Sequence, residues 1–298
     1  MKRFASILCV LMLMLASFTA GQQFPRGDVD LNGEVNIGDV VALIDYLLNG
    51  EWAVDPDAPE YGVFTANGVS FTMLPVKSGT FMMGATIEQG MDAMSWERPV
   101  HYVTLSSFSI GETEVTQELW EAVMGSNPSY FNDDPQRPVE MVSWQDCQLF
   151  IEQLNELTGK NFRLPTEAEW EFAARGGNQS MTNKYAGSGF VDNVAWYWND
   201  IPSQHSGNPG YGTQPVGTKM PNELGLYDMS GNVWEWCQDW YGSYTSGDQI
   251  DPTGPYAGTF RIFRGGSWSR SAESCRVSYR NFNYPSSKDE TMGLRIAL

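Results

Sequence analysis

Histidine and basic residues are scarce in this sequence. Among 298 residues there are only 2 histidines, and 18 lysines and arginines stand against 36 aspartates and glutamates, for a formal net charge of −18. This acidic excess disfavours nucleic acids and anionic membrane surfaces as partners and favours cations. His101 and His205 are far apart and lack the spacing of metal ligands, so histidine-based iron catalysis is not expected.

Cysteine is also sparse, with 4 in the chain. Cys9 lies inside an N-terminal apolar run, which leaves Cys147, Cys237 and Cys275 for the mature protein. An odd number of cysteines in an oxidising compartment permits one disulfide and one free thiol. The sequence also lacks GxSxG, HExxH and CxxC motifs and a glycine-rich phosphate loop, so hydrolase and nucleotide-binding functions have no support.

Long apolar runs are absent after the first residues. Lys2 and Arg3 precede an apolar run from Ile7 to Ala16, which is too short to cross a membrane as a mature helix. This pattern is typical of a signal peptide over residues 1–20, cleaved after Ala20. We therefore expect an exported protein that is secreted, periplasmic or associated with the cell surface, with no membrane span.

An acidic loop and a helix pattern occupy residues 21–50. Oxygen-bearing side chains fill the ligand positions of a calcium loop, and Gly33 stands where the loop must turn sharply. The segment resembles one calcium-binding repeat of a dockerin module. Because dockerins carry two repeats and this chain has one, we expect calcium binding, whereas docking onto a cohesin-like partner stays open. The expected calcium ligands are Asp28, Asp30, Asn32, Glu34, Asn36 and Asp39.

A linker and a larger domain follow. Residues 51–61 are rich in proline and acidic residues and predict a linker, which leaves residues 62–298 for one large domain. Runs of β-forming residues near the start of this domain predict strands at Phe71–Val76, at Thr80–Met83 and near His101–Leu105.

Three helix starts are marked by capping residues. Thr116 opens a predicted helix through Met124, and Ser143 opens a longer one to about Leu157. Thr166 opens a third helix. An acid stands three residues after each of the last two caps, which is the capping-box pattern.

The densest motif is Gly225–Tyr241, GLYDMSGNVWEWCQDWY, with three tryptophans within seven residues. Taken alone, such a cluster is more often protein core than a functional site. Together with Phe162–Gly177 (FRLPTEAEWEFAARGG) and Arg264–Trp268 (RGGSW), it resembles the formylglycine-generating enzyme family, also called sulfatase-modifying factors, from about Phe64 to Leu298. The resemblance implies an α+β, C-type-lectin-like fold, here preceded by the small calcium loop–helix unit.

The resemblance also implies a copper oxidase site, which this chain does not match. The family's oxidases bind copper and the substrate thiol with two cysteines just after Gly-Gly-Ser. Counting without gaps from Gly265, the first cysteine position holds Arg270 and the second holds Cys275, whereas counting back from Arg280 matches neither. Soft thiolates suit Cu(I), and one thiol cannot form the two-sulfur site. If the chain were an oxidase, the residues implied would be Cys275, Ser267 and Trp234.

The family's calcium sites are matched better. One site uses two side chains and two backbone carbonyls, and this chain keeps an oxygen ligand at each position, with Asp where the family has Asn. The other site has a recognisable beginning, Asn193 and Val194, but no recognisable downstream acid. The implied ligands of the first site are Asp228, Gly231, Val233 and Glu235.

The C-terminal segment resembles the ending of binding proteins of the same fold. Those proteins display side chains from this segment as a recognition face, which implies exposed positions within Ser269–Glu273 and Phe282–Glu290. A plain solvated loop is the alternative. The candidate face, for a protein or glycan ligand, comprises Trp234, Ser269, Arg270, Glu273, Phe282 and Tyr284.

We also predict a disulfide between Cys237 and Cys275, because both follow motifs that the resemblance places beside the site. Cys147 lies on a predicted helix and is expected to be a buried thiol. A free, reactive Cys275 is the competing possibility. The function expected from the sequence is an exported, calcium-binding, non-catalytic binding or structural module. The alternative is an oxidase that converts a sulfatase-type cysteine to formylglycine, with copper as its cofactor.

Overall fold

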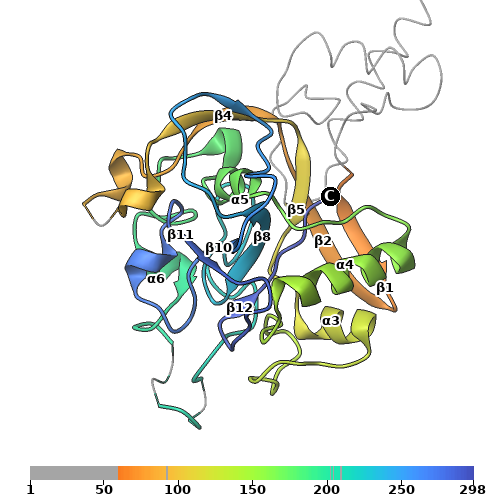
Figure 1. Ribbon diagram of the computed structural model, residues 1–298. Helices are drawn as coiled ribbons and strands as arrows, with labels where there is room; N and C mark the ends of the chain where they lie inside the picture. The colour runs from red at the N-terminus through yellow and green to blue at the C-terminus, as the bar shows by residue number, and fades with distance from the viewer. Residues whose placement is uncertain (1–59, 92, 202, 204, 209) are drawn as a thin grey trace, which may run out of the picture. The chain divides into compact units, whose positions relative to one another are not determined.

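The computed structural model describes residues 60–298 except 92, 202, 204 and 209 (Figure 1). The chain divides into two units, Met1–Ala58 and Pro59–Leu298. The predicted signal peptide, the calcium loop and its helix lie outside the described residues. Within the described part, no helix is long and apolar enough to cross a membrane.

The large unit begins with an antiparallel sheet of order β1-β2-β5, formed by Gly62–Ala66, Val69–Val76 and Phe108–Gly111. Asn67 and Gly68 join the first two strands, and their φ angles of +46° and +88° are those of a two-residue hairpin turn that favours Asn-Gly. The sequence therefore fixes the register of this hairpin locally, with Ala66 opposite Val69.

Two helices, α3 (Gln117–Met124) and α4 (Trp144–Thr158), pack against β1 (Figure 1). The Thr116 hydroxyl accepts a hydrogen bond from the Leu119 amide at the start of α3. At the start of α4, Ser143 and Asp146 form the predicted capping box. Both helices end at a glycine in the left-handed conformation, as is common at helix C-termini.

A second sheet has the order β3-β4-β9, formed by Gly79–Met83, His101–Leu105 and Gln249–Ile250. Helix α5 (Glu167–Ala174) packs against β3 and β4, and all eight of its residues are buried. Thr166 and Glu169 form the capping box expected there. A helix buried on every side belongs to the core of a large domain.

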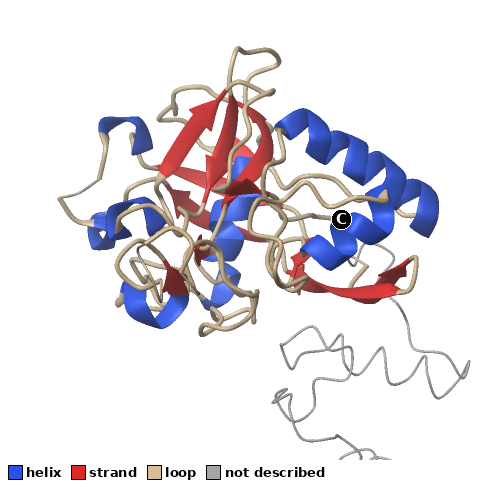
Figure 2. Ribbon diagram, turned by 90° about the horizontal axis from the view of Figure 1, so that it is seen from below, coloured by secondary structure: helices blue, strands red, loops and turns tan. Residues whose placement is uncertain are grey.

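The central sheet has the order β11-β10-β8-β12 and is built from the second half of the chain. A two-stranded parallel ladder, β6-β7, lies outside it. Much of the chain between the short elements is loop or turn (Figure 2). The remaining strands are β6 Ala195–Trp196, β7 Ser230–Gly231, β8 Trp234–Trp240, β10 Arg261–Arg264, β11 Arg280–Asn283 and β12 Met292–Gly293. The short helices are η1 Ile87–Gln89, η2 Ser95–Glu97, η3 Gly177–Gln179, α6 Val191–Val194 and η4 Ala272–Cys275.

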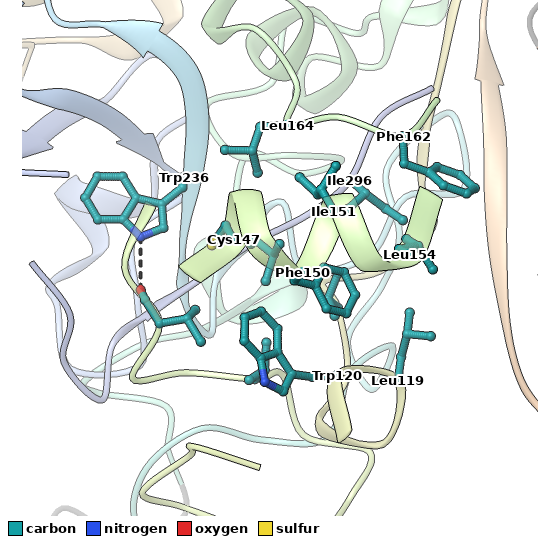
Figure 3. Close-up of a cluster of buried hydrophobic side chains, with 14 of the residues drawn as sticks. Leu119, Trp120, Cys147, Phe150, Ile151, Leu154, Phe162, Leu164, Trp236 and Ile296 are labelled. Atoms are coloured by element: carbon teal, nitrogen blue, oxygen red, sulfur yellow. Dashed lines mark hydrogen bonds between the residues drawn. The ribbon is translucent and has the colours of Figure 1, made fainter. Parts of the chain in front are cut away.

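The hydrophobic interior joins these layers. Trp120 and Phe150 stack with ring centroids 4.8 Å apart between α3 and α4 (Figure 3). Trp236, on β8, is buried in the same cluster, and its indole N–H donates to the Val142 carbonyl at 3.1 Å. Cys147 lies on α4 in this cluster and is fully buried, as expected for a structural thiol. The domain is therefore α+β, as the sequence predicts.

Candidate functional site

The segment after β10 turns sharply at Gly265 and Gly266, whose φ angles are +97° and +82°. A Cβ atom on Gly266 would lie 2.7 Å from the Cys275 sulfur, so only glycine allows the turn after β10 to approach Cys275 so closely. Cys275 is fully buried, and burial raises the pKa of its thiol to about 12. The thiol is therefore protonated and shielded from a substrate at neutral pH.

The other residues implied for an oxidase site do not form one. Arg270, at the first cysteine position, is exposed. Ser267 is buried, with its hydroxyl oxygen 3.5 Å from that of Ser269. Within the described residues, no three His, Cys, Asp or Glu side chains are placed to hold a metal ion. The geometry gives no two-sulfur copper site.

Trp234 is a core residue, which corrects its assignment to the candidate binding face. Its side chain is 2% exposed, and its ring contacts Phe263 and Tyr279 at centroid distances of 5.0 and 5.9 Å. The aromatic motif therefore supplies the interior of the central sheet. This is the outcome that tryptophan clusters most often have.

The predicted Cys237–Cys275 disulfide is also absent. The three cysteines of the described part are free and buried. Cys237 lies in the core cluster around α5, whereas Cys275 lies in a separate small cluster with Tyr185 and Tyr197. The two thiols face different clusters, and each donates to a nearby backbone carbonyl, Cys237 to that of Glu235 at 3.9 Å and Cys275 to that of Ser271 at 3.8 Å.

Of the implied calcium ligands, Asp228 lies just before β7 and Glu235 near the start of β8, close enough for the charge of Glu235 to act on Asp228. Asp228 is 2% exposed and has a φ of +58°. One of its carboxylate oxygens accepts from the Gly217 amide at 2.7 Å, and the other, Oδ1, is buried with no hydrogen-bond partner. A buried carboxylate oxygen without a donor is costly, so it marks a place where a cation or a water is needed.

The Glu235 carboxylate accepts more hydrogen bonds than that of Asp228. The Arg295 guanidinium donates to both of its carboxylate oxygens, and the Trp170 indole donates to one of them at 2.6 Å. A carboxylate has about four lone-pair sites, so at most one remains for an ion. Glu235 therefore fits a calcium site less well than Asp228 does.

The charge balance of this region favours a cation. A third buried carboxylate, Glu114, accepts hydrogen bonds from the Val233 amide and the Asn232 side chain. Burial and the charges of Asp228 and Glu235 raise the pKa of Glu114 well above its usual range. Burial, with Glu235 also contributing, raises the pKa of Asp228 to about 6. Arg295 pairs with Glu235, so Glu114 and Asp228 leave an excess of acidic groups here that a divalent ion would offset.

The second implied calcium position is different. Asn193 is exposed and donates to the Ser188 hydroxyl at 3.2 Å, while Val194 is buried. The Lys219 ammonium donates to the Asp192 carbonyl at 2.7 Å and forms an ion pair with Asp200. A cationic side chain thus already lies beside this stretch.

The rest of the candidate binding face is accessible. Arg270, Glu273 and Tyr284 are exposed, and Ser269 and Phe282 are half-buried. The centroid of the Phe282 ring lies 3.9 Å from that of the Tyr241 ring, and this contact holds the Phe282 side chain in place.

Four buried Arg–Glu ion pairs hold this C-terminal segment, and sequence reasoning did not predict them. Arg276 donates to both carboxylate oxygens of Glu97 at 2.6 and 2.7 Å, across 179 residues of sequence. The only signal was a recurrence of arginine in the last 35 residues. The other pairs are Arg264–Glu171, Arg280–Glu167 and Arg295–Glu235.

Comparisons with known proteins identify the family of the large domain. Residues 63–298 match the sulfatase-modifying factor enzyme 1-like domain. The chain is 37% identical over 219 residues to the chaperone protein LppX of Paenibacillus barcinonensis, covering 59% of this chain and 75% of that protein. It is 32% identical over 280 residues to the formylglycine-generating enzyme of Streptomyces coelicolor, covering 74% and 86%.

A solved structure, Treponema denticola variable protein 1, resembles this fold with a TM-score of 0.69 and 34% identity over 80% of this chain and 99% of that one. The structure of PvdO from Pseudomonas aeruginosa, with a TM-score of 0.62 and 24% identity over 80% of this chain and 99% of that one, shares the fold. The chain therefore belongs to the family of sulfatase-modifying factor enzyme 1-like domains.

Proposed function

We propose that this chain is an exported, calcium-binding member of the family that works as a non-catalytic binding module. The observation that carries this proposal is the state of the two cysteine positions. Arg270 is exposed at the first, and Cys275, at the second, is fully buried and protonated. A relative named for chaperone activity, LppX, supports a role in binding.

The oxidase alternative is tested directly. The full chain is incubated with copper, oxygen and a peptide containing Cys-x-Pro-x-Arg, with the Streptomyces coelicolor enzyme as the positive control. We expect no aldehyde in the peptide mass spectrum, because the three cysteines of the described residues are all buried and offer no pair of accessible thiols to copper. Formation of formylglycine by this chain would overturn the non-catalytic assignment.

Calcium is proposed at two places. In the large domain, Asp228 Oδ1 and the carbonyls of Gly231 and Val233 would hold the ion, with Glu235 contributing at most one oxygen. Hard oxygen ligands of this kind suit calcium, which would stabilise the turn before β8. The loop from Asp28 to Asp39, outside the described residues, would hold another.

Matched variants separate these two sites. We expect the double variant Asp28→Ala/Asp30→Ala to bind fewer calcium ions than the wild type, and so should Asp228→Gly, because glycine keeps the left-handed backbone but removes the ligand. Asp228→Asn should keep its ion with weaker affinity, since Asn retains an oxygen. Calorimetric stoichiometry measures this. Equal stoichiometry in all four proteins would exclude both sites.

The proposed ligand-binding face comprises Ser269, Arg270, Glu273, Phe282 and Tyr284. Its partner would be a protein or a glycan. Glycan-array binding and a pull-down with the mature chain should both be tested with the double variant Arg270→Ala/Tyr284→Ala. Loss of a wild-type interaction in this variant, but not in the exposed control Lys77→Ala, would support the face. Ligands retained by the double variant would place binding elsewhere.

A cohesin-like partner for the N-terminal repeat is a further proposal, tested with a cohesin domain as the probe.

A further inference from the structure

The described chain between β3 and β4, residues 84–91 and 93–100, leaves the second sheet and forms two short helical turns, η1 and η2. In Figure 1 it projects at the left of the domain, in orange to yellow. A cavity of about 680 Å³ lies between this excursion, the end of β3 and the chain at residues 175–182. Small-molecule sites in proteins commonly have volumes of about 300–1,000 Å³, so the size suits a small ligand.

The wall of this cavity is mainly apolar. Phe81, Met82, Ile87 and Val100 line it. Ile87 is 96% exposed and Met82 is 45% exposed, so both present apolar surface that nothing in the described part of the chain covers. Apolar side chains that gather around a concave surface mark a binding site more often than the same side chains scattered singly.

One edge of the cavity is held rigid by Arg175. Its guanidinium donates to Glu88 at 2.8 Å, to Glu171 at 2.9 Å and to the Gly84 carbonyl at 2.7 Å. These bonds tie the excursion to α5. Burial raises the pKa of Glu88, but hydrogen bonds from Thr86 and Arg175 outweigh it, and the net pKa is lowered. Glu88 is therefore ionised, and Arg175 neutralises it.

Arg98 is different. It lines the cavity and is exposed, and no carboxylate among residues 60–298 as described forms an ion pair with it. In a chain with twice as many acids as bases, a cation left over beside an apolar wall is unusual. Since Arg175 and Glu88 offset each other, the lining carries a net positive charge, opposite in sign to the protein as a whole.

We propose that this cavity binds a small amphipathic carboxylate, with its apolar body against Phe81, Met82, Ile87 and Val100 and its carboxylate on the Arg98 guanidinium. The planar guanidinium donates two parallel hydrogen bonds to a carboxylate, which fits this head group. This site lies on elements other than the proposed ligand-binding face, so the two can be tested separately.

Calorimetric titration of the full chain with sodium decanoate, below its micelle concentration, tests the assignment. Decanol and decyltrimethylammonium serve as neutral and cationic probes of the same chain length. We expect decanoate to bind, and Arg98→Gln to weaken its binding by at least about tenfold, because a hydrogen-bonded charge pair is lost. Decanol binding should be the same in Arg98→Gln and in the wild type. Ile87→Asp should weaken both, and the exposed control Lys77→Gln neither.

Three results with the decyl probes would overturn the assignment. They are no decanoate binding by the wild type, equal decanoate affinity in Arg98→Gln, and decyltrimethylammonium binding as tightly as decanoate. An apolar peptide is the further competitor to exclude. If a hydrophobic pentapeptide amide binds more tightly than decanoate and is insensitive to Arg98→Gln, the cavity recognises polypeptide and the assignment is wrong. A folding defect is separated from a binding defect by comparing the thermal unfolding of each variant with that of the wild type.

Discussion

Two groups of buried carboxylates in this domain differ in what compensates their charge. In the first group, each glutamate has an arginine in direct contact, as Glu97 has Arg276 at 2.6 Å. In the second, no lysine or arginine of the described residues forms an ion pair with the carboxylate. The first group is Glu97, Glu167, Glu171 and Glu235. The second is Glu114, Glu140, Asp228 and Asp239.

The difference shows in protonation. In Glu97, hydrogen bonds from Arg276 outweigh the effect of burial, and its pKa is lowered. In the second group no hydrogen bond or positive charge outweighs the effect of burial. Burial raises the pKa of Glu140 to about 7 and that of Asp239 to about 8. The charges of the paired carboxylates are offset by arginine, whereas the unpaired ones are places where a proton or a metal ion can bind.

The largest effect is expected from breaking a pair. Arg276→Met leaves the Glu97 carboxylate buried without its guanidinium, which typically costs about 3–5 kcal/mol of folding free energy. Urea unfolding of the wild type and the variant measures this. The double variant Glu97→Gln/Arg276→Met should regain part of the loss, because it leaves no uncompensated charge. A single variant within about 1 kcal/mol of the wild type would show that the pair does not hold the C-terminal segment.

The helices could be predicted from sequence because their signals are local. Thr116, Ser143 and Thr166 cap the helices that begin beside them, as expected. The Arg276–Glu97 pair could not be predicted, because its partners are 179 residues apart and nothing near Glu97 specifies an arginine.

The candidate site shows the same limit. The motif containing Asp228 was found through the family resemblance, and the structure places its carboxylate as a buried group with an unpaired oxygen. The burial of Trp234 and the separation of Cys237 from Cys275 depend on how β8 packs against the rest of the domain. Sequence spacing alone does not specify that packing.

An effect of intermediate size on stability is expected from Glu140, a carboxylate of the second group. Glu140 accepts from the Phe131 amide at 2.8 Å, and its second carboxylate oxygen is buried with no partner. Burial raises the pKa of Glu140 in the folded protein from its usual 4.5 to about 7, so the folded state holds this proton more tightly than the unfolded state. The stability this group contributes is present below the unfolded pKa and is lost as pH rises through about 7.

Glu140→Gln removes this dependence. Between pH 4.5 and 8 the wild type should lose on the order of 3 kcal/mol more than the variant, since a tenfold change in proton affinity corresponds to about 1.4 kcal/mol. Urea unfolding at several pH values measures the slope. Asp228 and Asp239, whose pKa values are raised to about 6 and about 8, titrate in the same pH range and should keep a residual slope in the variant. Glu121→Gln, exposed on α3, should behave as the wild type. Identical slopes in Glu140→Gln and the wild type would contradict the expectation.

The smallest effect is expected from an ion pair that water already solvates. Lys288 lies 3.4 Å from Asp146, and their side chains are 49% and 35% exposed. Solvent screens such a pair, and holding two side chains together costs entropy, so exposed pairs typically contribute about 0–1 kcal/mol. The Ser143 hydroxyl and amide also donate to Asp146, so its capping role at α4 does not depend on the lysine.

Lys288→Gln should therefore change urea stability by less than about 0.5 kcal/mol, and this small change should shrink further in 0.5 M salt. Ser143→Ala, which removes the cap itself, should cost about 1 kcal/mol and respond little to salt. If Lys288→Gln were instead as damaging as Arg276→Met, burial would not be what separates strong ion pairs from weak ones in this domain.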